Sequence, residues 1–266
     1  AKGMGLIGAA FGLGFIAGPA IGGILAGGDL ANTNFTLPPY AAAGFSMAAF
    51  LLAIFSLKES LPAELRTIVS RRTSPERWAQ LIETMFRPNV LIPLILTFMA
   101  IFVFASLEAT FAMWTERTFG WGVAQNGYVF ACTGILSAIV QGILVGPMSQ
   151  KWGEPLLIRQ GFIALCLGLL IIPLANSVEL LLIAMAIVTY GFSLASPALS
   201  SHLSLQVAAE EQGIIFGIGR SASTLARALG PAGSGYVFAF LGKDWPFFIG
   251  AILMLLVLIL SFIVNK

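Results

Sequence analysis

The sequence predicts an all-α integral membrane protein with eight transmembrane helices. Of its 266 residues, 58% are hydrophobic and 10% are charged, and the mean hydropathy is +0.93. A soluble globular domain carries about 25% charged residues, so this class is excluded. The charges are also unevenly spread, with one in residues 3–57, ten in 58–88 and four in 89–153. Two apolar blocks therefore flank one polar connector.

Eight apolar segments are long enough to cross a bilayer, because about 20 helical residues span the ~30 Å hydrocarbon layer. They are residues 4–27, 38–57, 89–114, 123–147, 156–174, 178–203, 213–241 and 245–265. Each is continuously apolar, whereas the strands of a membrane barrel alternate polar and apolar residues. A helix also pairs its backbone polar groups within the segment, as the lipid interior requires. We therefore expect eight helices rather than a barrel.

The distribution of Lys and Arg predicts how these spans are oriented. With the N-terminus in the cytoplasm, the inner segments carry ten of these residues and the outer segments carry two, Arg117 and Lys243. The excess of positive charge marks the cytoplasmic side. An even number of spans then puts both termini in the cytoplasm. The expected location is the cell membrane, meaning the inner or plasma membrane. The first apolar run follows Ala1-Lys2 directly and has the length of a full span, so no cleavable signal peptide is expected.

The polar connector contains a second, shorter helical pattern. Ser74 and Pro75 are typical of an N-cap followed by Pro at the first helical position. The apolar residues that follow share one helix face: Trp78, Leu81, Ile82 and Met85. This pattern predicts an amphipathic helix that lies either on the cytoplasmic membrane surface or against the cytoplasmic ends of the protein itself.

The first and seventh spans are similar in sequence. A shift of 212 residues superimposes Gly5, Gly18, Pro19 and Gly23 on Gly217, Gly230, Pro231 and Gly235. Each of the two spans is followed by a loop containing Pro and by one more span, so the repeat unit has six helices. Residues 1–57 then hold the last two helices of a first unit, residues 58–88 form the connector, and residues 89–266 form the complete second unit. The prolines predict kinks, and the glycines allow a close approach of other helices.

Parallel six-helix repeats joined by a cytoplasmic connector are the architecture of the major facilitator superfamily. The run from Gly14 through Gly18, Pro19 and Gly22 to Gly23 resembles the antiporter signature in the fifth helix of that family. The resemblance covers the whole chain as helices five to twelve, with helices one to four absent. It implies a secondary transporter of the drug:proton antiporter and tetracycline-efflux branch, which exports small organic compounds by alternating access.

The same resemblance extends to one loop. Gly146, Lys151 and Gly153 match the second-half copy of a conserved cytoplasmic loop of the family. This chain departs from the pattern at two positions, with Gln150 in place of the acid and Glu154 in place of a base.

The fourth span has a face of small residues, each four positions from the next. They are Gly134, Ala138, Gly142 and Gly146. Small residues at this spacing let two membrane helices pack closely. We expect the first and fourth spans to pack together along this face, across the interface between the two units.

Glu108 is the best single candidate for a functional residue. It lies well inside the third span, where an acid costs about 2.5–3.5 kcal/mol on insertion scales. Such residues mark ion or substrate paths, so Glu108 is a candidate for proton coupling or for binding a cationic substrate. The alternative is a structural ion pair. Arg227, in the seventh span on the same face as Arg220, is expected to bind an anion, to pair with Glu108 or to contact the absent helices.

The remaining polar candidates are weaker. Gln141 and Asn126 are expected to offer hydrogen bonds in a central cavity, although polar residues in membrane helices often bond neighbouring helices instead. His202, the only histidine, is either a proton relay or an interfacial histidine.

Other classes of function lack support. The sequence contains no phosphate-binding loop, no metal-ligand spacing and no nucleophile–base set. We therefore expect that the protein has no cofactor and is not an enzyme. A net charge of +2 gives no case for nucleic acid. The expected partners are the lipid bilayer, a small-molecule substrate, protons, and either the missing N-terminal helices or a second chain. An importer or uniporter of a sugar or metabolite, and an inactive fragment or membrane scaffold, stay open as alternatives.

Overall fold

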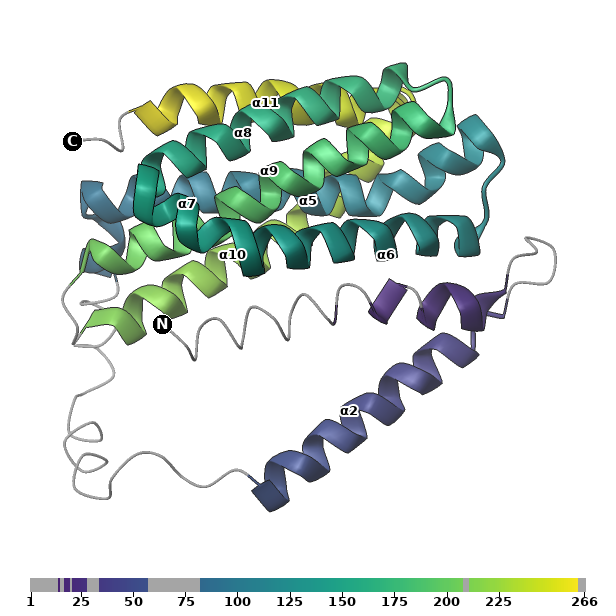
Figure 1. Cartoon of the computed structure of the whole chain (residues 1–266), viewed down its shortest axis with the longest axis horizontal. Coiled ribbons are helices and arrows are strands. Elements are labelled where there is room, and N and C mark those ends of the chain that lie inside the picture. The colour runs from purple at the N-terminus through teal and green to yellow at the C-terminus, as the bar shows by residue number, and fades with distance from the viewer. Residues whose placement is uncertain are drawn as a thin grey trace.

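A computed structural model describes residues 14, 17–19, 21–27, 34–56, 82–207 and 211–262. All regular elements in this part of the chain are helices (Figure 1). They are α2 (Leu37–Ser56), α5 (Pro88–Phe119), α6 (Val123–Ile139), a π-helical segment (Val140–Leu144), α7 (Val145–Trp152), α8 (Glu154–Ile171), a 3₁₀ turn (Ile172–Leu174), α9 (Val178–Leu205), α10 (Gln212–Phe240) and α11 (Trp245–Ser261). The all-α prediction is confirmed.

The described helices fall on the predicted membrane spans. Within the described ranges, five helical stretches are long and apolar enough to cross a bilayer: Leu37–Ser56, Pro88–Phe119, Val123–Trp152, Glu154–Leu174 and Val178–Leu205. α11 is apolar but has 17 residues, whereas α10 has 29 residues and carries two arginines. These seven stretches correspond to spans two to eight. Span one is described only in part, where residues 17–19 and 21–26 are helical.

The predicted connector helix falls mostly outside the described residues. Of residues 58–88, those before 82 are not described, and residues 82–86 form one helical turn. Ile82 is exposed there and Met85 is half-buried. The amphipathic helix and the boundaries of the three predicted regions therefore stay predictions.

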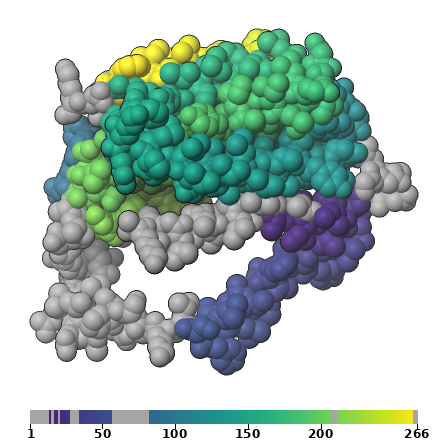
Figure 2. Space-filling model, in the orientation of Figure 1, coloured from purple at the N-terminus to yellow at the C-terminus, as the bar shows by residue number. Residues whose placement is uncertain are grey.

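Helices α5 to α11 form one closely packed body, from which α2 diverges (Figures 1 and 2). α8 packs along α9, α10 packs along α5, and α11 contacts both α8 and α5. The centre of the body is apolar and includes fully buried Phe111, Trp114, Phe162 and Phe247. α2 has no buried residue, so its apolar side chains are left for lipid or for other helices.

Two glycines bring α8 and α9 into backbone contact. A Cβ atom on Gly191 would lie 2.5 Å from the Gly161 carbonyl oxygen and 2.7 Å from the Leu165 nitrogen. A Cβ atom on Gly161 would likewise lie 2.6 Å from the Gly191 carbonyl oxygen. Any side chain at either position would separate the helices, so this crossing requires glycine.

The π-helical segment interrupts α6 ahead of Pro147. The Val145 N–H bonds to the Val140 carbonyl five residues back, instead of four. Pro147 has no N–H, and its ring crowds the carbonyl of Ile143, so the helix widens by one residue just before it. The sequence analysis did not anticipate this segment, although Pro147 was its signal.

The described part of span one packs on α6, at the start of that helix. The close approach joins Gly23 to Gly127, where a Cβ on Gly127 would lie 3.2 Å from the Gly23 Cα and 2.9 Å from the Pro19 oxygen. A Cβ on Gly142 or Gly146 would meet open space. The same is true of Gly14, Gly18 and Gly22 in span one. The predicted pair of helices therefore meets near the start of α6. Residues 1–13 of span one lie outside the described residues, so packing along the rest of the small-residue face stays a prediction.

The second copy of the signature packs on a different helix. A Cβ on Gly230 would lie 2.7 Å from the Phe102 oxygen of α5, and the Ser106 hydroxyl donates to the Gly230 carbonyl at 3.1 Å. α10 runs on as a helix through Pro231, and Gly235 faces open space. The two Gly-Pro copies thus share a sequence pattern but contact different neighbours, α6 for span one and α5 for α10.

Candidate functional site

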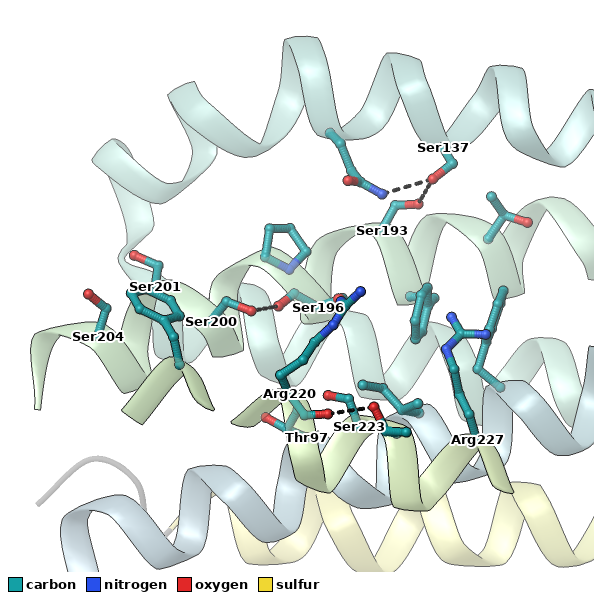
Figure 3. Close-up of a pocket in the computed structure, with 18 of the residues that line it drawn as sticks. Thr97, Ser137, Ser193, Ser196, Ser200, Ser201, Ser204, Arg220, Ser223 and Arg227 are labelled. Carbon is teal, nitrogen blue, oxygen red and sulfur yellow. Dashed lines mark hydrogen bonds between the residues drawn. The ribbon is translucent and has the colours of Figure 1, made fainter. Parts of the chain in front are cut away.

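A cavity of about 1000 Å³ lies between α5, α6, α9 and α10 (Figure 3). Half of the 22 residues that line it carry a hydroxyl group. These are Thr97, Thr133, Ser137, Thr189, Ser193, Ser196, Ser200, Ser201, Ser204, Ser223 and Thr224. The size matches the pockets that bind small organic molecules.

The α6 and α9 walls are joined by a hydroxyl network. The Ser193 hydroxyl donates to the Ser137 oxygen at 2.8 Å, and Gln141 Nε2 donates to the same oxygen at 2.9 Å (Figure 3). Gln141 lies in the π-helical segment and lines the cavity, where the sequence analysis expected it. The widened turn thus carries a side chain that can bond a ligand.

An aromatic pair forms part of the same wall. The rings of Phe104 from α5 and Phe192 from α9 stack with centroids 3.9 Å apart and planes 12° apart. A flat apolar surface of this kind suits the ring system of a drug-like molecule.

The charges of the cavity come from α10. Arg220 and Arg227 project from α10 into the cavity, towards α9 (Figure 3). Arg227 Nη1 donates to Glu108 Oε2 of α5 at 3.1 Å. The Arg227 side chain is 46% exposed and the Glu108 side chain is 27% exposed. The structure thus brings the two strongest sequence candidates together, and Arg227 links the acid to the cavity.

Asn126 is placed elsewhere and does not line the cavity. Its Oδ1 accepts from the Thr115 hydroxyl at 2.8 Å, and its Nδ2 donates to the Gly122 carbonyl at 2.9 Å. The residue is buried in the first turn of α6, and both its polar atoms are bonded to α5 and the loop. Asn126 therefore holds the start of α6 against α5 and does not reach the cavity.

His202 is also outside the cavity lining. Its ring Nε2 lies 3.3 Å from Gln206 Nε2 one turn later, and the residue is buried near the end of α9. This placement agrees with an interfacial histidine.

Of the three predicted loop residues, Gly146 and Lys151 lie in α7, and Gly153 alone lies between α7 and α8. Gly153 has φ +75° and forms the bend, whereas Gly146 faces open space. The Lys151 ammonium lies 5.5 Å from the centroid of the Trp152 ring. Glu154 Oε1, at the start of α8, accepts from the hydroxyls of Ser149 in α7 and Ser201 in α9, both at 3.1 Å, so this carboxylate connects the three helices.

Polar contacts that the sequence analysis missed connect α5 to its neighbours at both ends. At its start, Arg87 Nη1 donates to Glu211 Oε2 at 2.9 Å, and this bond raises the pKa of the Arg87 guanidinium above its ordinary value. At its other end, Trp114 Nε1 donates to Asp244 Oδ1 at 2.7 Å. Each pair is more than 120 residues apart in sequence, so no local pattern could predict it.

Comparison with known proteins places the chain in a wider context. The sequence profile described as Major Facilitator Superfamily matches residues 1–231 and 119–266. Multidrug resistance protein 2 of Bacillus subtilis (strain 168) is 27% identical over 254 residues, which are 96% of this chain and 62% of that protein. Tetracycline resistance protein, class G, of Vibrio anguillarum is 31% identical over 264 residues, 97% of this chain and 64% of that protein.

A solved structure supports the fold. The human organic anion transporter MFSD10 (TETRAN) superimposes with a TM-score of 0.74 at 24% identity, over 98% of this chain and 63% of that one. The chain spans less than two thirds of each of these three proteins.

Proposed function

Because the chain belongs to the Major Facilitator Superfamily, a family of multi-pass plasma-membrane transporters, we propose that it acts in proton-coupled export of small organic or drug-like compounds. The transport cycle is alternating access, in which the cavity opens to one side of the membrane at a time. The observation that carries the proposal is the 1000 Å³ cavity with the Glu108–Arg227 pair at its wall. The printed names of the relatives, multidrug and tetracycline resistance proteins, support the substrate class.

The ion pair supplies a way to couple protons to substrate. When Glu108 takes up a proton, it no longer neutralises Arg227, and the guanidinium becomes a net positive charge in the cavity wall. A cationic compound is then repelled, and it also competes with the proton for Glu108. Proton binding and cation binding therefore oppose each other, which is the linkage that an exchange of the two requires.

The proposed topology follows the sequence. Both termini face the cytoplasm, residues 1–57 and 89–266 belong to the two halves, and residues 58–88 connect them. The rest of the cavity comes from further membrane helices, either the first four of the family pattern or those of a second chain. The partners are lipid, the small-molecule substrate and protons.

Flux measurements in vesicles test the proposal. The native protein is reconstituted, and accumulation of a cationic dye is followed after a one-unit pH jump. Exchange of one proton per molecule supports about tenfold accumulation, and Glu108→Gln is expected to abolish it. Glu116→Gln is the matched control, because Glu116 lies on the same helix but is exposed near its end. Equal accumulation by wild type and Glu108→Gln would show that Glu108 does not couple the proton.

The hydroxyl-rich lining favours a second candidate, an importer or uniporter of a sugar or metabolite. Hydroxyl groups suit a polyhydroxylated ligand because each can accept hydrogen bonds from it, and a hydroxyl that does not already donate to a carbonyl can also donate one. Sugar flux that is unaffected by the pH jump, without flux of the dye, would favour this candidate.

A further inference from the structure

One guanidinium group outside the cavity lacks the partners that a buried charge requires. Arg159 lies in the second turn of α8, and its Nε and Nη2 atoms are buried without a hydrogen-bond partner among the described residues. The ion pairs formed within the same part of the chain do not include Arg159. A buried charge is costly unless it is paired, so an unpaired one in a native structure points to a bound anion.

The surroundings of Arg159 hold the charge in place without neutralising it. The guanidinium carbon lies 4.3 Å from the centroid of the Phe262 ring, at the C-terminal end of α11. Glu154, five residues earlier on α8, bonds Ser149 of α7 and Ser201 of α9 instead. Basic side chains near the end of a membrane helix usually extend to water. Arg159 is folded against α11 instead, and the residue as a whole is half-buried, so part of it stays open at the surface.

The open part of Arg159 belongs to an apolar surface that α8 and α11 share. The two helices lie side by side (Figure 1). The exposed apolar residues of α8 on the same side as Arg159 are Leu156, Ile163 and Leu170. Those of α11 in line with Phe262 are Ile259, Leu255 and Ile252. Together with Arg159 and Phe262, these residues are the α8–α11 face. Exposed apolar side chains on a membrane helix contact acyl chains, so this face has one cation at the end of a lipid-contacting surface.

We propose that the α8–α11 face binds one anionic phospholipid, with the lipid phosphate on Arg159 and the acyl chains along the exposed apolar residues. The two free oxygens of a phosphodiester match the fork of guanidinium N–H groups. Basic groups between membrane helices are recognised lipid-headgroup sites. A zwitterionic lipid carries the same phosphate, but its own ammonium group competes with Arg159 for it, so an anionic headgroup is favoured. Arg159 does not line the cavity, so this site is separate from the proposed transport path.

Lipid competition on the purified native protein tests the site. The protein in neutral detergent is mixed with equal amounts of dioleoyl phosphatidylglycerol and dioleoyl phosphatidylcholine, and the retained lipids are counted by native mass spectrometry. We expect the wild type to retain one phosphatidylglycerol about tenfold more tightly than phosphatidylcholine, the scale of one charge-assisted hydrogen bond. Arg159→Gln should lose this preference, whereas Arg159→Lys should keep part of it, because the ammonium retains the charge but not the fork.

Arg117→Gln is the matched control. The Arg117 guanidinium also stacks on an aromatic ring, with its carbon 4.6 Å from the centroid of Phe238, but Arg117 is exposed near the end of α5. This variant should keep the full preference for phosphatidylglycerol. Inorganic phosphate and glycerol 3-phosphate should not displace the lipid, because they lack the acyl chains that contact the α8–α11 face.

Thermal unfolding separates lipid binding from a folding defect. Because Nε and Nη2 of Arg159 lack partners, Arg159→Gln in neutral detergent should unfold at the wild-type temperature or above it. Added phosphatidylglycerol should raise the unfolding midpoint of the wild type more than that of Arg159→Gln, whereas phosphatidylcholine should raise both equally.

Four results would overturn the proposal. They are equal retention of the two lipids by the wild type, the same loss of preference in Arg117→Gln, displacement of the lipid by inorganic phosphate, and a lower midpoint of Arg159→Gln in neutral detergent. None of these measurements involves transport, so the lipid site and the proposed function stand or fall separately.

Discussion

The crossing of α8 and α9 predicts a large effect of one added methyl group. A Cβ on Gly191 would lie 2.5 Å from the Gly161 oxygen and 2.7 Å from the Leu165 nitrogen, and both are backbone atoms that no rotamer change can move. Ordinary van der Waals contact requires about 3.5 Å, so the helices must separate by up to ~1 Å in Gly191→Ala. Overpacking of this kind costs about 1–3 kcal/mol, while replacing Gly by Ala within a helix returns up to about 1 kcal/mol.

Two backbone contacts are about 1 Å too short, which corresponds to the upper part of this range, about 2–3 kcal/mol, so the net destabilisation is about 1–2 kcal/mol. For a chain of this size, that lowers the midpoint of thermal unfolding by about 2–8 °C. The assay follows the reaction of the half-buried Cys166 thiol with a fluorogenic reagent during heating in detergent, with the exposed Cys132 replaced by Ser.

Gly217→Ala is the matched control. Gly217 is also helical, but a Cβ there would have no atom within 4 Å. Its unfolding midpoint should stay the same or rise. If Gly191→Ala unfolds at the same temperature as Gly217→Ala, the reasoning about the crossing is refuted.

Two further substitutions test the polar contacts near the C-terminal end of α5. Asp244→Ala removes the acceptor of the buried Trp114 Nε1–H and should destabilise the protein by about 1–3 kcal/mol, measured as a lower unfolding midpoint. Asp244→Asn keeps an acceptor and should lower the unfolding midpoint much less. Asn126→Ala should cost about 1 kcal/mol of stability and leave dye accumulation in vesicles intact, because Asn126 bonds Thr115 outside the cavity; a transport loss without destabilisation would contradict that placement.

Hydropathy was sufficient to predict the helices, because each apolar run must satisfy its own backbone in lipid. The same scarcity of polar residues singled out Glu108 and Arg227. Glu108 is an acid deep in an apolar run, and Arg227 is a base deep in another, so their pairing was among the alternatives that the sequence offered. The sequence could not choose between pairing, anion binding and contact with other helices, because that choice depends on where α10 meets α5.

The depth of a residue in the membrane and the packing partners of each helix were harder to predict. Asn126 was expected in the central cavity, but span boundaries are uncertain by several residues, and it lies in the first turn of α6. The small-residue face of α6 is compatible with a closely packed helix and equally with the wall of a cavity, and the sequence does not distinguish the two. Gly134 lines the cavity, whereas the helix contact is made at Gly127. Contacts such as Arg87 with Glu211 join segments 124 residues apart and required the fold itself.

We propose that the cavity between α5, α6, α9 and α10 is a substrate path that opens in turn to each side of the membrane. Thr224 tests it directly, because it is exposed and lines the cavity between the two arginines. Leu225, its neighbour, is 53% exposed but does not line the cavity, so it serves as the control position.

The measurement is the labelling rate of Thr224→Cys and Leu225→Cys by a membrane-impermeant thiol reagent, in a background without Cys132 and Cys166. The reagent is added to one side of the membrane and then to the other, with and without the transported dye. The account predicts that Thr224→Cys is labelled from both sides and that the dye slows its labelling, while Leu225→Cys is unaffected by the dye. Labelling of Thr224→Cys from one side only, or at a rate that the dye does not change, would contradict the account.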